Sequence, residues 1–351
     1  MQRERLYRWL TLVLLLVLVA ILLAYTELVA SAYIERIVVL LGINIILVVS
    51  LNLSNGYTGV FSLGHIGFMA IGAYTAAVLT LPLSQKQLNL PDLPAWLSTV
   101  ELPFLAATLI AGLLATVIAL LVGLSLMRLT GPYVSVATMG LLVIVQVILI
   151  NWDSVTRGAR TFAGVPPHTN LWWVWGWTIV TVYVIWRIAK SSFGRQLVAV
   201  RDNEIAAQSL GISVMRSRLL AFCVSAFFTG VAGSLWAHFL TSFSPKSFYF
   251  ALTFSIITML AVGGMGSVSG SIIGTVAITV LSEVLRNAER GISLGFVKIP
   301  PVYGASQILM AILFVLVIVF RPSGLLGNRE INFNRLWSKI FPQVDPTKGG
   351  A

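Results

Sequence analysis

The chain has 351 residues, of which 58% are hydrophobic and only 10% are charged, whereas soluble domains carry about 25% charged residues. This composition excludes an ordinary soluble enzyme. The net charge of +11 would suggest nucleic acid as the partner of a soluble protein, but the 23 Lys and Arg residues lie mostly between apolar segments, as the orientation signals of membrane proteins do.

The N-terminus carries Arg3, Arg5 and Arg8 and then an apolar segment from Trp9 to Ala24. This order is similar to that of a secretory signal peptide, although the apolar segment is slightly long for one. We therefore favour a retained first helix over a cleaved signal.

Apolar segments long enough to cross a bilayer follow one another along the chain. We expect an all-α polytopic membrane protein, a bundle of about ten transmembrane helices within a range of eight to ten. The regions 37–53 and 250–286 are short or closely spaced, and a broken or re-entrant helix in either would lower the number. The expected spans are 9–30, 37–53, 60–81, 102–126, 132–150, 171–189, 218–240, 250–266, 270–286 and 302–320.

The connections between these spans are too short to hold a folded soluble domain. We expect residues 1–320 to form a single transmembrane domain and residues 321–351 to form a tail. If the N-terminus is cytoplasmic, most Lys and Arg residues fall on that side, in agreement with the positive-inside rule. This rule places both termini, the loop 191–217 and the tail in the cytoplasm.

Small residues recur every four positions in several spans. Because helices in lipid associate where small side chains let backbones approach, this spacing predicts a tightly packed bundle rather than a substrate site. The clearest examples are Ala111, Ala115, Ala119 and Gly123 in one span and Ala226, Gly230 and Ser234 in another.

The segment from Asn52 to Tyr74 is the richest in polar residues and glycines at membrane depth. Glycines lower helix propensity, so a continuous helix is doubtful there, as in transport proteins where a helix breaks beside a cavity. Ser62 and His65 would lie on one face of a helix, one turn apart. Two interpretations of His65 stay open, a structural hydrogen bond to a neighbouring helix and a position on a translocation path.

No catalytic motif, nucleotide-binding motif or proton relay is present in the sequence. We find no P-loop, no G-x-S-x-G, no intramembrane pair of carboxylates and no chain of buried acids for proton transport. The single cysteine, Cys223, cannot form an intramolecular disulfide, and no Cys/His cluster has metal-ligand spacing. Work against a gradient would therefore require another subunit that hydrolyses nucleotide.

The loop 191–217 is expected to carry a short helix that contacts a partner protein. Asp202 or Asn203 can cap its N-terminus, Glu204 suits the positive end of the helix dipole, and Gly211 can end it. A solvated connecting helix is the alternative.

Here the sequence resembles the permease subunits of bacterial ATP-binding-cassette importers of the branched-chain amino-acid class. Glu204-x-Ala206-Ala207-x-x-x-Gly211 is similar to the coupling motif of that family, although Glu204 precedes the alanine pair by one extra residue. The resemblance covers about residues 40–290 and indicates the second of the two paired permeases. It includes Gly56-Tyr57-Thr58-Gly59, Ser62-Leu63-Gly64-His65, Asn151-Trp152-Asp153-Ser154, Phe193-Gly194-Arg195 and Gly263-Gly264-Met265-Gly266-Ser267.

The resemblance implies a permease in a bacterial inner membrane that takes up branched-chain or other hydrophobic amino acids by alternating access. It implies four kinds of partner, namely a second homologous permease, two ATPase subunits, an extracytoplasmic solute-binding protein and membrane lipid, with no nucleic acid. This chain would bind no cofactor, because ATP and Mg would be held by the ATPases. The implied coupling residues are Arg195, Glu204, Ala206, Ala207 and Gly211, and the candidates for the translocation path are Asn52, Tyr57, Ser62 and His65.

Three alternatives remain open at the sequence level. The same architecture could carry urea or a short amide, because similar permeases serve those solutes. The glycine-rich broken spans are also compatible with a stand-alone channel or facilitator, and the small-residue packing alone with a membrane scaffold.

Overall fold

The computed structural model describes residues 17, 20–289, 293–294, 297–298, 304–321, 323–327 and 330. Residues 38–329 form one compact unit, and residues 1–37 with 330–351 form another. Arg3, Arg5 and Arg8, the first part of the expected span 9–30 and most of the tail 321–351 lie outside the described residues.

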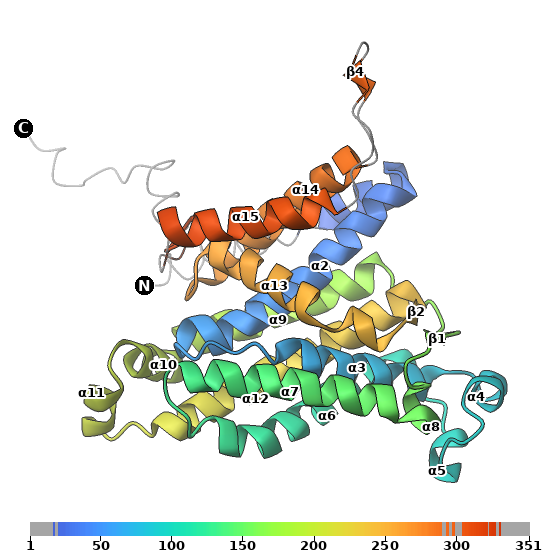
Figure 1. Cartoon of the computed structure of the whole chain (residues 1–351), viewed down its shortest axis with the longest axis horizontal. Helices are drawn as coiled ribbons and strands as arrows, with labels where there is room; N and C mark the ends of the chain where they lie inside the picture. The colour runs from blue at the N-terminus through green and yellow to red at the C-terminus, as the bar shows by residue number, and fades with distance from the viewer. Residues whose placement is uncertain are drawn as a thin grey trace, which may run out of the picture. The chain divides into compact units, whose positions relative to one another are not determined.

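The described chain is built almost entirely of helices, coloured in chain order in Figure 1. The elements are α2 (Ala32–Asn52), the π-helix η1 (Leu53–Tyr57), α3 (His65–Thr80), α4 (Leu83–Asn89), α5 (Ala95–Ser98), α6 (Phe104–Leu126), α7 (Pro132–Asn151), α8 (Asp153–Thr156), β1 (Phe162–Ala163), α9 (Leu171–Lys190), α10 (Ser192–Asp202), α11 (Glu204–Ser209), α12 (Val214–Leu240), β2 (Ser242–Phe243), the 3₁₀ helix η2 (Pro245–Ser247), α13 (Phe250–Gly263), α14 (Val268–Glu289), β3 (Ser293–Leu294), β4 (Val297–Lys298) and α15 (Ala305–Phe320). β1 pairs with β2 and β3 with β4, both antiparallel.

Seven helices among the described residues are long and apolar enough to cross a membrane, or eight if the bent pair α3 and α4 is one span. This confirms the all-α polytopic fold class; the count of seven lies just below the predicted range of eight to ten, and the count of eight lies at its lower end. The seven are Ala32–Tyr57, Phe104–Leu126, Pro132–Asn151, Leu171–Lys190, Val214–Leu240, Pro245–Gly263 and Val268–Asn287.

The segment 52–74 breaks as its glycine content predicts. α2 runs into η1 and ends at Tyr57, and the chain is then non-helical until His65, where α3 begins. The expected span 60–81 is therefore shorter at its start. It also turns sharply at its end, because α3 and α4 make an angle of 118°.

Helices α3, α6 and α12 pack closely against one another. At Gly72 of α3 a Cβ atom would lie 2.1 Å from the Gly230 carbonyl oxygen of α12, so these two backbones nearly touch. One turn further along α12, Ser234 shares a hydrogen bond of 2.8 Å with Thr108 of α6, between their hydroxyls. Small and hydroxyl side chains thus make the tight bundle that the sequence predicts.

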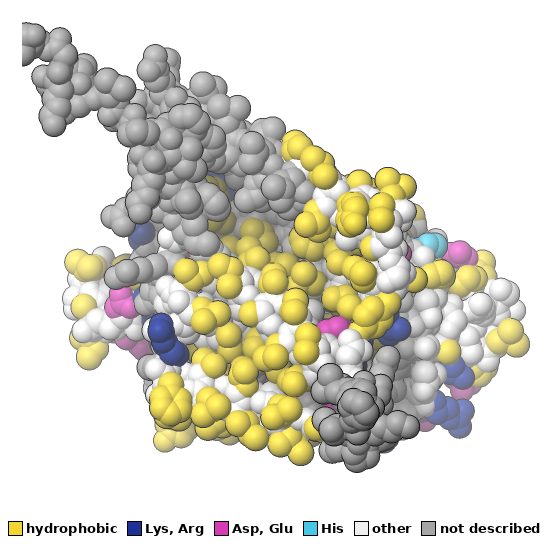
Figure 2. All heavy atoms as spheres, turned by 90° about the horizontal axis from the view of Figure 1, so that it is seen from above, with side chains coloured by type: hydrophobic (Ala, Val, Ile, Leu, Met, Phe, Trp, Pro, Cys, Tyr) yellow, Lys and Arg dark blue, Asp and Glu magenta, His cyan; other side chains and the backbone are white. Residues whose placement is uncertain are grey.

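The outer surface is strongly apolar, and hydrophobic side chains cover much of the face seen in Figure 2. On the helices, Leu121 of α6 is 64% exposed and Val136 of α7 is 69% exposed. Such exposure suits helices that face lipid rather than water.

Candidate functional site

The loop 191–217 folds into two short helices, α10 and α11, joined at Asn203. Ser191 caps α10, since its hydroxyl oxygen accepts from the Gly194 N–H at 3.2 Å. Asn203 caps α11, since its amide oxygen accepts from the Ala206 N–H at 3.0 Å. Of the two predicted caps, Asp202 and Asn203, the structure selects Asn203 for α11.

The C-terminus of α11 is closed by a left-handed residue, Gly211, with φ of +79°. The Gly211 N–H donates to the Gln208 carbonyl at 2.9 Å, and the Ile212 N–H donates to the Ala207 carbonyl at 3.0 Å. These two bonds form a Schellman motif, which satisfies the last carbonyls of the helix. The predicted end of the helix at Gly211 is confirmed.

One face of this helical pair is packed and the other is open. Val200 of α10, Ala207 of α11 and Val214 of α12 form a small buried cluster. The side chains of Ile205 and Leu210, in contrast, are 78% and 79% exposed. Two large exposed apolar side chains, one in α11 and one at the residue that caps its end, offer anchors of the kind found at the centre of protein interfaces.

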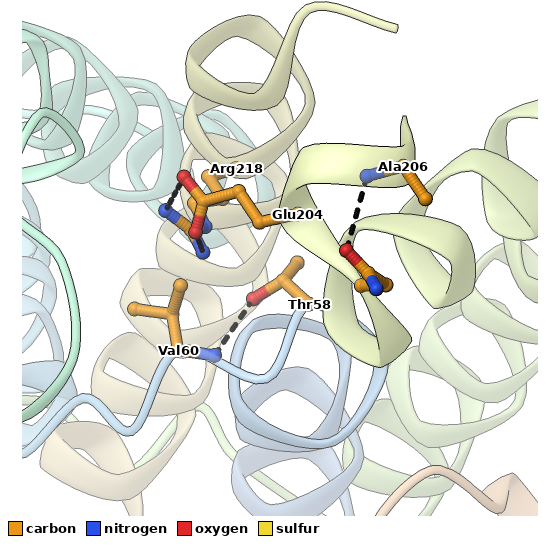
Figure 3. Close-up of polar contacts among 6 residues, drawn as sticks. Thr58, Val60, Glu204, Ala206 and Arg218 are labelled. Atoms are coloured by element: carbon orange, nitrogen blue, oxygen red, sulfur yellow. Dashed lines mark hydrogen bonds and ion pairs between the residues drawn. The ribbon is translucent and has the colours of Figure 1, made fainter. Parts of the chain in front are cut away.

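Glu204 and Arg218 tie α11 to the start of α12, as Figure 3 shows. Arg218 donates from Nη2 to Oε2 of Glu204 at 2.9 Å and from Nη1 to Oε1 at 3.4 Å. The Arg218 side chain is 10% exposed and that of Glu204 is 32% exposed. Glu204 therefore acts within the chain, because both carboxylate oxygens are used to orient α11.

The remaining coupling candidates lie on the same two helices. Arg195 of α10 and Ala206 of α11 are exposed, whereas Ala207 is 2% exposed. Ala207 thus packs against the rest of the protein, and Ala206 lies on the exposed surface of α11.

The break between α2 and α3 is held by polar side chains that bind backbone. Asn55 makes a reciprocal pair with Ser62, since its amide nitrogen donates to the Ser62 carbonyl and its amide oxygen accepts from the Ser62 N–H, both at 3.1 Å. The Thr58 hydroxyl accepts from the Val60 N–H at 3.2 Å, also drawn in Figure 3. The non-helical segment is therefore fixed rather than open, because its side chains replace the missing helical hydrogen bonds.

Asn52 connects this break to the turn between α13 and α14. Its amide nitrogen donates to the Ser267 carbonyl at 2.9 Å, and its amide oxygen accepts from the Gly266 N–H at 2.8 Å. Asn52 is completely buried. Nothing in the sequence links positions 52 and 266, so these two hydrogen bonds of Asn52 could not be predicted.

His65 is hydrogen-bonded on both ring nitrogens, at 3.1 Å to the Ser62 hydroxyl and at 2.7 Å to the Ser225 hydroxyl of α12. Because the Ser225 hydroxyl donates to the Ser50 carbonyl, it accepts from His65, so Nε2 carries the proton. Ser62 then donates to Nδ1. This geometry matches the structural interpretation of His65, a bond to a neighbouring helix.

The four path candidates cluster at the break but are closed off from solvent. Asn52 and Ser62 are 0% exposed, and Tyr57 and His65 are 5% exposed. None of them lines either of two cavities on the described part of the chain. One is an apolar groove of about 560 Å³ between α3, α6 and α7. The other measures about 330 Å³ and lies beside Arg218.

The match to a known protein family covers nearly the same residues as the helices from α2 to α15. The protein-family model described as "Branched-chain amino acid transport system / permease component" matches residues 33–320. The high-affinity branched-chain amino acid transport system permease protein LivM of Escherichia coli K12 is 30% identical over 318 residues, covering 81% of this chain and 68% of the relative.

More distant relatives match about half of the chain. A probable branched-chain amino acid transport permease protein LivM of Methanocaldococcus jannaschii is 25% identical, covering 48% of this chain and 51% of the relative. The autoinducer 2 import system permease protein LsrC of Klebsiella pneumoniae is 28% identical, covering 43% of this chain and 47% of the relative. Permeases named for different cargoes are thus similar to this chain.

Proposed function

The chain belongs to the family of branched-chain amino acid transport system permease components, and we propose that it carries branched-chain or other hydrophobic amino acids inward by alternating access. It is a multi-pass protein of the inner membrane and a permease subunit of an ATP-binding-cassette importer. In this proposal two ATPase subunits bind ATP and Mg, a second homologous permease completes the path, and an extracytoplasmic binding protein delivers the solute.

The observation that carries the proposal is the helical pair α10 and α11. α11 is capped at both ends, held to α12 by Glu204 and Arg218, and presents Ile205 and Leu210 outward. A rigid helix with exposed apolar anchors is suited to dock into a cleft of another protein. We assign the ATPases as the occupant of this surface, so that α10 and α11 and both termini are cytoplasmic.

The translocation path is proposed to pass near the break between α2 and α3. Asn52, Tyr57, Ser62 and His65 gather there, and broken helices in transporters accompany substrate sites. Their burial fits a state in which the path is shut, and opening would require movement of η1 or α3.

The docking role is tested by replacing Ile205 with glutamate and purifying the tagged chain under mild detergent from its native membrane. We expect the ATPase recovered with Ile205→Glu to fall by about tenfold or more, as for a buried interface anchor. Leu88→Glu is the matched control, because Leu88 of α4 is equally exposed, at 82%, and lies outside α10 and α11. Equal ATPase recovery from Ile205→Glu, Leu88→Glu and the unchanged chain would contradict the docking role.

A further inference from the structure

Arg201, in the last turn of α10, reaches out of the docking helices and into the membrane domain. Its Nη1 donates to the Gly56 carbonyl of η1 at 3.0 Å. Its Nε donates to Oδ1 of Asp202 at 3.0 Å. The Asp202 side chain is 62% exposed and that of Arg201 only 21% exposed, so the guanidinium lies between the loop surface and the helix end.

The same arginine also packs against the segment that follows η1. A Cβ atom at Gly59 would lie 2.7 Å from the Arg201 Cγ and 3.3 Å from its Cβ. Arg201 therefore touches this segment at two points, with its charged group on Gly56 and with its aliphatic stem on Gly59.

The bond to Gly56 is stronger than an ordinary surface contact. Gly56 lies at the C-terminal end of the continuous span Ala32–Tyr57, where the last carbonyls have no helical donor and the helix dipole is negative. A guanidinium that donates to such a carbonyl makes a charge-assisted hydrogen bond. Arg201 thus completes the end of α2 and η1 from outside the helix.

Gly56 is itself wedged between two other groups. A Cβ atom there would lie 1.9 Å from Oδ1 of Asn52 and 2.4 Å from the Gly266 nitrogen. Asn52 in turn holds both Gly266 and Ser267 in the turn between α13 and α14. A displacement of Gly56 toward these two groups therefore pushes on Asn52, on the turn, or on both.

These contacts form a continuous physical connection from α10 through η1 to the turn 264–267. η1 is a π-helix, a rare element that is frequently found at functional sites. We propose that Arg201 is a positioning residue that transmits movement of the docking helices to the α13–α14 turn through Gly56 and Asn52. The inference rests on the proposed function, since it assumes that ATPases move α10 and α11.

The first test measures ATP hydrolysis and solute uptake separately in liposomes that hold the complete importer. We expect Arg201→Met to lower uptake per ATP hydrolysed by about tenfold or more, the loss that a missing charged hydrogen bond produces. ATPase recovery and basal hydrolysis should not change, and Arg201→Lys should restore part of the uptake. The control is Arg128→Met, which removes an exposed arginine after α6 and should leave the ratio unchanged.

The second test reports on the turn itself and does not depend on uptake. A fluorophore is attached to Met265→Cys in a Cys223→Ala background, because Cys223 is the chain's only cysteine and Met265 is half-buried in the turn. We expect ATP to change the fluorescence when Arg201 is present, to leave it unchanged in Arg201→Met, and to change it again in Arg201→Lys.

The outcomes separate this inference from the proposed function. If the unchanged importer transports and Arg201→Met transports equally well per ATP, or keeps the ATP-dependent fluorescence, the role of Arg201 is wrong and the proposed function stands. If Arg201→Met no longer retains the ATPases, Arg201 belongs to docking and the inference is overturned. If the unchanged importer shows no ATP-driven uptake, the proposed function fails, and the inference fails with it.

Discussion

Glu204 and Arg218 lie 14 positions apart and meet in a two-point ion pair. The motif at 204–211 could be recognised in the sequence, but the partner of Glu204 could not. An arginine at the start of a span is common, and nothing in the sequence marks Arg218 as the residue that pairs with Glu204. Glu204 occupies the first turn of α11 and bonds back to α12, while Ala206 faces outward.

Gly211 supports a prediction for a single residue. Its φ of +79° is a left-handed conformation, and a Cβ atom there would meet nothing within 4 Å. Gly211→Val is therefore penalised by backbone conformation alone, by about 1–2 kcal/mol, which loosens the end of α11. We expect lower uptake per ATP hydrolysed in reconstituted liposomes, with the ATPases still bound.

The control for Gly211→Val is Gly140→Val. Gly140 also has open space around its Cβ position, but its φ is not in the left-handed region, and within a helix valine costs no more than glycine. Gly140→Val should behave like the unchanged chain. Uptake by Gly211→Val that equals that of Gly140→Val would mean that the left-handed end of α11 does not matter for coupling.

For the path candidates, the sequence predicted that they form hydrogen bonds but not with which residues. Polar residues in an apolar span predict buried hydrogen bonds, and His65, Ser62 and Asn52 all make them. Their partners Ser225 and Gly266 could not be predicted, because no local pattern relates one span to another. Arg201 was missed for the same reason, since its target Gly56 is distant in sequence.

At the scale of helices, periodicity and composition predicted the spans well. The expected segments 102–126, 132–150 and 171–189 agree closely with α6, α7 and α9. The expected span 60–81 was wrong at its start, because hydropathy does not sense the hydrogen bonds of Asn55 and Thr58 that keep residues 58–64 out of a helix. The small-residue stripe at Ala226, Gly230 and Ser234 correctly predicted the tight face of α12.

The contact between α3 and α12 supports a prediction for this helix pair. A Cβ atom at Gly72 would lie 2.1 Å from the Gly230 carbonyl oxygen, and both atoms belong to rigid helices. Gly72→Ala should push the helices apart and lower the free energy of unfolding by about 1–3 kcal/mol, as overpacking does. The measurement is thermal unfolding of the purified protein in detergent.

Gly176→Ala is the matched control for Gly72→Ala. Gly176 lies in α9, and a Cβ atom there would meet nothing within 4 Å, so alanine should be neutral or slightly stabilising. Equal midpoints for the two variants would show that α3 and α12 do not touch as closely as described.

At the scale of the whole molecule, the family match and the exposed apolar side chains of the helical pair α10 and α11 support one account. The chain is a permease component by its family, and we propose that separate ATPases drive it through α10 and α11. The fold class, the family and the short helix in the loop 191–217 followed from the sequence. The internal connections that would make the loop act on the membrane path did not, because they join segments far apart in the chain.

The central claim is tested most directly by solute uptake into liposomes that contain this chain, its ATPases, a second permease and the binding protein. We predict uptake of a branched-chain amino acid that requires both ATP and the binding protein, and no flux through this chain alone. Flux through the chain alone without ATP, or a complete assembly that moves no amino acid when ATP is supplied, would contradict the account.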